Sequence, residues 1–196
     1  MKLKLLHVMQ ILAVSLILVS CQTSPSQLPS PTVLDSPQQE IKQLWAVIEE
    51  SNNADDPIIF RIDESNQSIN ASASKTYRRI TITQGVVKAY AKGILTKHDV
   101  AFLICHELGH LSPNAHLAGG GQSEEKYADY YAILLMDEMY QEGLGVNPRE
   151  GIKIIMKWSV DHNWSDGIHP SDNDRYKYLT ERLDYWDKHQ GEIEAG

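Results

Sequence analysis

The segment of residues 105–132, CHELGHLSPNAHLAGGGQSEEKYADYYA, constrains the fold of this chain more than any other part of the sequence. It gathers three histidines and four acidic residues, which a packed core would not need together. Thr96 and Asp99 form a capping box that predicts a helix beginning just before this segment. The helix should end close to Leu111, because Pro113 disfavours helical backbone at the residue before it.

A run of glycines at residues 119–121 separates this first helix from a second one. Glycine adopts backbone angles that other residues avoid, so the run allows the chain to reverse its direction. Ser123 is expected to cap the second helix, which should run to about Gly143. The segment therefore predicts two helices, the second folded back across the first.

The string HELGH places His106 and His110 four residues apart, so both imidazoles should project from one face of the first helix. Two neutral imidazoles at this spacing suit a zinc ion, which keeps one position open for water when three protein groups hold it. Glu107 lies beside them and is expected to act as the general base, not as a ligand.

Two residues compete to be the third ligand. His116 follows His110 by the six residues of a histidine-only pattern, but Pro113 stands where that pattern has a glycine with positive φ. Glu125 follows fifteen residues after His110, at the start of the second helix. We expect Glu125 to be the ligand and keep His116 as the alternative. Asp129, one turn later, should accept a hydrogen bond from the remote nitrogen of a ligating histidine.

The first twenty residues combine two lysines with an apolar run that ends at Cys21, a pattern typical of an export signal. The run is shorter than a comfortable membrane span. The string LVSC at its end resembles the lipobox of bacterial lipoproteins, which implies removal of residues 1–20 and lipidation of Cys21. Residues 21–37 hold four of the eight prolines and predict a tether.

Residues 38–196 are expected to form one α+β domain, mainly helical with a small sheet. Strands are predicted around residues 57–63 and 80–83, and helices around residues 36–48 and 84–91, after Asn147 and after Ser171. The formal net charge of −8 argues against nucleic acid as a partner. Cys105, the second of two cysteines, has no disulfide partner once Cys21 is lipidated and is expected to be a buried apolar residue.

The pair HELGH and EEKYAD resembles the H-E-x-x-H and E-x-x-A-D motifs of the M48 zinc metallopeptidases. The likeness extends upstream through INASASKTYRRITITQGVVKAYAKGILTKHDVAF and downstream to HPSDNDRYKYL, roughly Ile41 to Trp186. The short spacing between the motifs is similar to that of the small, exported, lipoprotein-type members. The resemblance implies a zincin-like fold with HELGH on a central helix and one zinc ion per chain, held by His106, His110 and Glu125.

Three further residues are candidates to stabilise the developing oxyanion. His169 is the first choice, and Arg175 and Tyr127 follow it. The resemblance also implies that a histidine in the region of His169 can swing onto the zinc, whereas a purely structural role would be to cap a helix beside Pro170. For Arg175 a salt bridge that positions the last helix is the favoured interpretation.

We expect a zinc metalloendopeptidase that hydrolyses extracytoplasmic proteins, with Glu107 as general base. Residues 70–73, NASA, are expected to be an edge strand or a polar loop; an edge strand can pair with an extended or misfolded substrate. The resemblance implies attachment to the bacterial cell envelope through Cys21, with the outer membrane facing the periplasm favoured. The alternative is a zinc-stabilised binding or chaperone-like lipoprotein without turnover.

Overall fold

The computed structural model describes residues 36–52, 56–159 and 171–193. The predicted signal, the lipidation site Cys21, nearly all of the tether and the candidate His169 lie outside these residues. The described helices are α2 (Pro37–Asn52), α3 (Gln84–Ala91), α4 (Lys97–Leu111), α5 (Gly121–Gln141), α6 (Pro148–Gly151), α7 (Lys153–Ser159), α8 (Asp172–Ile193) and the 3₁₀ turn η2 (Ala115–Ala118). The strands are β1 (Ile59–Asp63), β2 (Ala71–Ser74) and β3 (Arg79–Thr83). This helix-rich chain with one small sheet confirms the α+β prediction.

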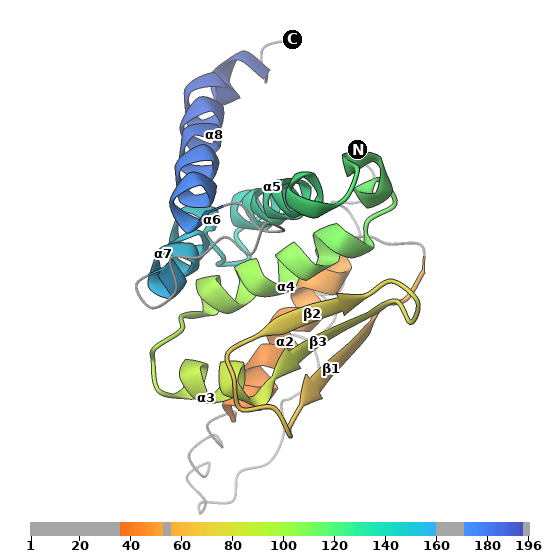
Figure 1. Cartoon of the computed structure of the whole chain (residues 1–196). Coiled ribbons are helices and arrows are strands. Elements are labelled where there is room, and N and C mark those ends of the chain that lie inside the picture. Colours follow the sequence, from red (N-terminus) through yellow and green to blue (C-terminus); the bar gives the residue numbers. More distant parts are fainter. Residues whose placement is uncertain (1–35, 53–55, 160–170, 194–196) are drawn as a thin grey trace, which may run out of the picture. The chain divides into compact units, whose positions relative to one another are not determined.

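The sheet has the strand order β1-β3-β2, with β1 parallel and β2 antiparallel to the central β3. Ile80 and Ile82 of β3 are fully buried, because the alternation of the strand turns both toward the helices. Residues 71–73 of the NASA segment lie in β2, which is an edge of this sheet. Figure 1 shows β2 as the strand beside α4.

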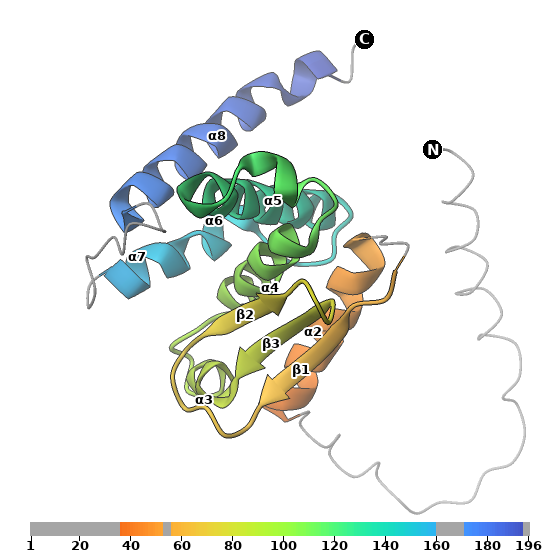
Figure 2. The same ribbon diagram turned by 45° about the vertical axis from the view of Figure 1, so that its right-hand side comes forward.

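Helix α4 is the central element of the domain (Figures 1 and 2). It contacts β2 on one side and α5 on the other, while α2 packs beside it. Its predicted capping box is confirmed, since Asp99 N donates to Thr96 Oγ1 and Thr96 N donates to Asp99 Oδ2. Nearly every residue of the helix is buried, including Phe102, Ile104 and Cys105. A buried helix of this kind can hold polar side chains in fixed positions.

The start of α5 differs from the prediction. Ser123 is an exposed residue inside the first turn, and the helix begins at Gly121 after Gly120, without a side-chain cap. Gly120 has φ 78°, so the glycine run itself turns the chain into the helix three residues early. The caps at Asn147 and Ser171 are confirmed, because their side chains accept hydrogen bonds from the first backbone N–H groups of α6 and α8.

Gly109 lets α4 and α5 approach each other closely. A Cβ atom at this position would lie 2.6 Å from the backbone Cα of Ala128, so a side chain would force the helices apart. We expect Gly109→Ala to destabilise the fold by about 1–3 kcal/mol, the typical cost of overpacking. Ser123→Ala, on an exposed position of α5, is the control and should change little. Urea unfolding measures both; equal midpoints would contradict the close packing.

Candidate metal centre

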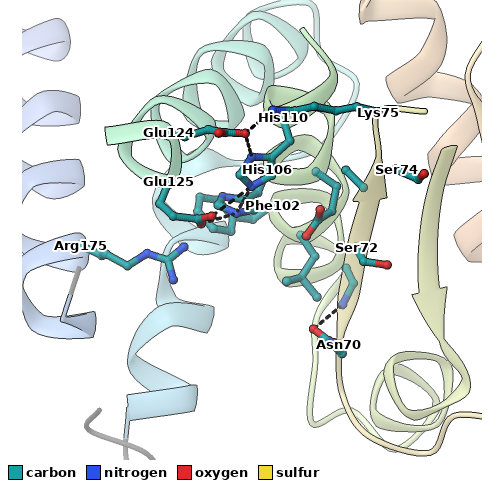
Figure 3. Close-up of a pocket in the computed structure, with 14 residues that line it drawn as sticks. Asn70, Ser72, Ser74, Lys75, Phe102, His106, His110, Glu124, Glu125 and Arg175 are labelled. Atoms are coloured by element: carbon teal, nitrogen blue, oxygen red, sulfur yellow. Dashed lines mark hydrogen bonds and ion pairs between the residues drawn. The ribbon is translucent and has the colours of Figure 1, made fainter. Parts of the chain in front are cut away.

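Three side chains from α4 and α5 converge at one point (Figure 3). Nε2 of His106 lies 3.3 Å from Nε2 of His110. The carboxylate of Glu125 completes the group, with Oε2 3.3 Å from His106 Nε2 and Oε1 3.5 Å from His110 Nε2. His106 and Glu125 are buried and His110 is partly buried. The three residues could therefore hold a metal ion.

The separations fit a tetrahedral metal. Two ligand atoms bound about 2.0–2.1 Å from a tetrahedral zinc ion lie roughly 3.4 Å from each other. The Nε2–Nε2 separation of 3.3 Å agrees with this value, and each Nε2 lies 3.3 or 3.5 Å from one oxygen of the Glu125 carboxylate. Among the described residues the group offers three protein ligands, the number found in catalytic zinc sites, which keep a fourth position for water.

The second nitrogen of each histidine faces a carboxylate. Nδ1 of His106 lies 2.9 Å from Oδ1 of Asp129, although the angle at the nitrogen is not that of a hydrogen bond. Nδ1 of His110 lies 3.2 Å from Oε1 of Glu124. Because carboxylates accept protons, Nδ1 of each neutral ring carries the hydrogen and Nε2 keeps its lone pair. The lone pairs then converge with the Glu125 oxygens, which favours a cation between them.

Asp129 is held in place by groups from α8. Its two oxygens accept hydrogen bonds from Nε and Nη2 of Arg175 at 2.9 and 2.6 Å, and the hydroxyl of Tyr178 donates to the same carboxylate. Burial raises the pKa of Asp129, but Arg175 and His106 outweigh it and keep the pKa below its usual value. The carboxylate is therefore ionised, and its Oδ1 lies 2.9 Å from Nδ1 of His106.

A corresponding chain of contacts supports His110, and the sequence analysis missed it. Glu124 Oε1 receives a hydrogen bond from Lys75 Nζ at 2.6 Å and faces His110 Nδ1 on its other side. Thus a carboxylate lies next to Nδ1 of each histidine, and each of these carboxylates bonds to a cationic side chain. The only signal in the sequence was the second glutamate directly before Glu125, and nothing local connects Lys75 with it, 49 residues away.

Glu107 lines the same cleft as the three candidate ligands and is outside their group. Its side chain is buried, and burial raises the pKa of its carboxyl group above the usual value, while the two histidines oppose the shift. A carboxylate with a raised pKa is a stronger base, and general-base catalysis is favoured when this pKa lies closer to the working pH. The backbone N–H of Ala73 in β2 also bonds to this carboxylate, which fixes its position against the sheet.

The cleft itself has a volume of about 640 Å³. Residues 70–75, the β2 segment, form one wall, α5 contributes Glu124 and Glu125 to the other, and Phe102 and Leu103 of α4 supply apolar surface. Arg175 also lines it. The cleft therefore offers a strand edge, an apolar surface and a candidate metal site side by side.

The negative charges around His106 favour the binding of a cation. Burial lowers the pKa of this imidazole, but its contacts with Asp129 and Glu125 outweigh burial and raise the pKa to about 10. The negative field that attracts a proton also attracts a divalent cation, and metal binding at Nε2 would release that proton.

The remaining candidates lie elsewhere. His116, the alternative ligand, is on η2 and is not among the three grouped residues. Tyr127 pairs with Ser112, Oη to Oγ at 2.9 Å, and does not line the cleft. Arg175 forms the salt bridge that was favoured for it and also reaches the cleft. Cys105 is buried, as predicted.

Comparisons with protein-family models, curated proteins and solved structures found no match for this chain. Along the described ranges, none of the helices combines the length and the apolar character needed to cross a membrane.

Proposed function

We propose that this protein is a zinc metalloendopeptidase of the M48 type with a zincin-like domain. The observation that carries the proposal is the convergence of the His106 and His110 Nε2 atoms, 3.3 Å apart as expected for two ligands of a tetrahedral zinc ion, with the carboxylate of Glu125. The neighbouring Glu107 supports peptide hydrolysis, because a zinc site without turnover needs no buried acid with a raised pKa in the same cleft.

In the proposed reaction a bound zinc ion supplies Lewis acidity, which activates water and polarises the carbonyl of the scissile bond. The Glu107 carboxylate removes a proton from the attacking water and returns it to the leaving amine nitrogen. Asp129 and Glu124 keep the protons of the two histidines on Nδ1, so that Nε2 faces the site. The oxyanion donor is proposed to be His169, with Arg175, which lines the cleft, as the second candidate.

The substrate is proposed to be an extended or misfolded protein segment. Strand β2 has β3 on only one side, so a peptide can pair with its other edge, although the N–H groups of Ala71 and Ala73 would have to exchange their present acceptors, Asn70 Oδ1 and Glu107. The small side chains of Ala71 and Ala73 leave room for those of a substrate. A folded protein would not present such a strand to the cleft.

The protein is also proposed to act in the bacterial envelope, tethered through a lipid on Cys21, with the outer membrane favoured. We expect cells grown with a fatty-acid analogue to label the wild-type protein and not Cys21→Ser. Cys105→Ser is the matched control and should keep the label, because burial raises the pKa of its thiol and makes it unreactive. Labelling of Cys21→Ser would show that the tether is not lipidated.

Two substitutions test the ligand set. Glu125→Gln removes an anionic oxygen donor and should weaken zinc binding by about 10-fold or more, measured by competition with a chelating dye. His116→Ala should leave the zinc affinity unchanged. If His116→Ala weakened zinc binding and Glu125→Gln did not, His116 would be the third ligand. The proposed ligand set of two histidines and one glutamate would then be wrong.

A further inference from the structure

A second, smaller cavity adjoins the proposed active-site cleft. It has a volume of about 140 Å³ and shares Lys75 and His110 with the cleft. The turn after β2 and the end of α4 form its walls, together with η2. A peptide that follows the edge of β2 past Ser74 therefore reaches this cavity within a residue or two, since each strand residue advances about 3.3 Å.

The two cavities differ in charge. The cleft has Glu107, Glu124 and Glu125 beside its cations Lys75 and Arg175, whereas the smaller cavity has Lys75, Arg78 and His116 and no carboxylate among its lining residues. This is a local basic site in a chain whose formal net charge is −8. An anionic group would be attracted to it.

The guanidinium of Arg78 has N–H donors that the protein does not fully use in hydrogen bonds. Its Nη2 reaches only the backbone carbonyl of Asp56, at 3.4 Å, and its Nε has no hydrogen-bond partner although it is buried. Arginine binds carboxylates strongly through its N–H groups. A carboxylate in the cavity would be an acceptor for the guanidinium, whose hydrogen bond to Asp56 is long.

The backbone at Arg78 is also unusual. It is the one non-glycine residue with positive φ in the described ranges, at 43°, in the turn between β2 and β3. Glycine or asparagine would adopt this conformation at less cost, so an arginine here is strained. Strain of this kind is found at ligand-binding positions, which agrees with the unused donors of the side chain.

Lys75 already binds a carboxylate from within the protein. Its Nζ lies 2.6 Å from Oε1 of Glu124, across the end of the cleft between β2 and α5 (Figure 3). The Lys75 side chain is 57% exposed, and exposed ion pairs of this kind are weak enough to exchange partners. Glu124 thus occupies the position that an incoming carboxylate would take.

We propose that the cavity lined by Lys75, Arg78 and His116 is a substrate subsite for an acidic side chain, a glutamate or aspartate next to the scissile segment. This inference rests on the proposed peptidase function and names its specificity. The bound carboxylate accepts from the guanidinium of Arg78 and from Lys75. Glu124 then keeps its contact with His110.

The test uses pairs of fluorogenic peptides that carry glutamate or glutamine at one position, scanned along the peptide. At one position the zinc-loaded protein should cleave the glutamate peptide about 10-fold better or more in kcat/KM, as expected for a charge-assisted hydrogen bond. Arg78→Gly suits the positive φ and should abolish this preference while the protein stays folded, and Arg78→Lys should keep part of it. Arg79→Gln, at a neighbouring arginine outside the cavity, is the matched control and should keep all of it.

A binding measurement separates this inference from the proposed function. Zinc-loaded Glu107→Gln protein should bind the labelled glutamate peptide about 10-fold more tightly than its glutamine twin, and Arg78→Gly should remove the difference. Equal binding of the two peptides, or a preference that survives Arg78→Gly, overturns the subsite. Selective binding without cleavage by the wild-type protein would support the subsite and contradict the peptidase.

Discussion

Replacing Glu107 with glutamine is expected to lower peptide cleavage by roughly a hundred- to ten-thousand-fold. The amide has almost the same volume as the carboxylate, but it cannot take a proton from the attacking water or return one to the leaving amine. Glu107 lies outside the grouped ligands, so the variant should keep its zinc and melt close to the wild-type temperature. Cleavage of a fluorogenic peptide and the zinc content of the same sample measure the two quantities together.

Glu138→Gln is the matched control, because Glu138 is exposed on α5 and does not line the cleft. It should cleave at the wild-type rate. Full activity of Glu107→Gln would refute Glu107 as the general base, and loss of zinc along with activity would mean that Glu107 supports the metal site itself.

Asp129→Asn is expected to cost about 3–5 kcal/mol of folding free energy, which is typical when one partner of a buried ion pair is removed. The Asp129 side chain is fully buried and that of Arg175 is 8% exposed, so the change leaves a buried guanidinium without its anion. Zinc affinity should fall as well, by about 10- to 100-fold, since His106 loses the carboxylate that orients it. Chemical unfolding and dye competition measure the two effects.

Two control variants test whether the loss of stability comes from the broken ion pair and not from an Asp→Asn change on α5 as such. Asp137→Asn, two turns later on α5, should change stability by less than about 0.5 kcal/mol. Combining Asp129→Asn with Arg175→Met removes both charges and should recover part of the loss. If the double variant is no more stable than Asp129→Asn, the unpaired charge is not the cause.

The Asp129–Arg175 ion pair also predicts how the free energy of unfolding depends on pH. Burial raises the pKa of Asp129, but Arg175 and His106 outweigh it, so the folded-state pKa lies below the unfolded value of about 3.9. As pH falls, the unfolded chain takes up this proton first. The contribution of Asp129 is therefore fully present above roughly pH 5 and declines as the solution becomes more acidic. Asp129→Asn should show a flatter acid-unfolding curve than the wild type.

Local sequence patterns predicted the elements that hold the metal centre. The capping box at Thr96 and the proline after Leu111 set the ends of α4, and both depend on backbone chemistry within one turn. The placement of His106 and His110 on one face of α4 follows from the helical period alone. These features were predictable because they involve residues only a few positions apart.

Tertiary contacts were not predictable in the same way. Lys75 and Glu124 are 49 residues apart, and no pattern in either segment indicates that the end of β2 meets the start of α5. The Arg175 salt bridge was expected, but its partner Asp129 lies 46 residues earlier on another helix. At Gly120 the left-handed backbone of the glycine run replaced the expected serine cap. Such outcomes depend on how the elements pack, which one sequence does not encode locally.

The most direct test of the account is the metal content of the purified protein, followed by cleavage of an unfolded protein with and without a chelator. We predict about one zinc ion per chain, cleavage that the chelator abolishes, and recovery when zinc is added back. Stoichiometric zinc without any cleavage would favour the binding or chaperone-like alternative over a peptidase. A purified, folded protein that binds no zinc would contradict the central claim that His106, His110 and Glu125 form a zinc site.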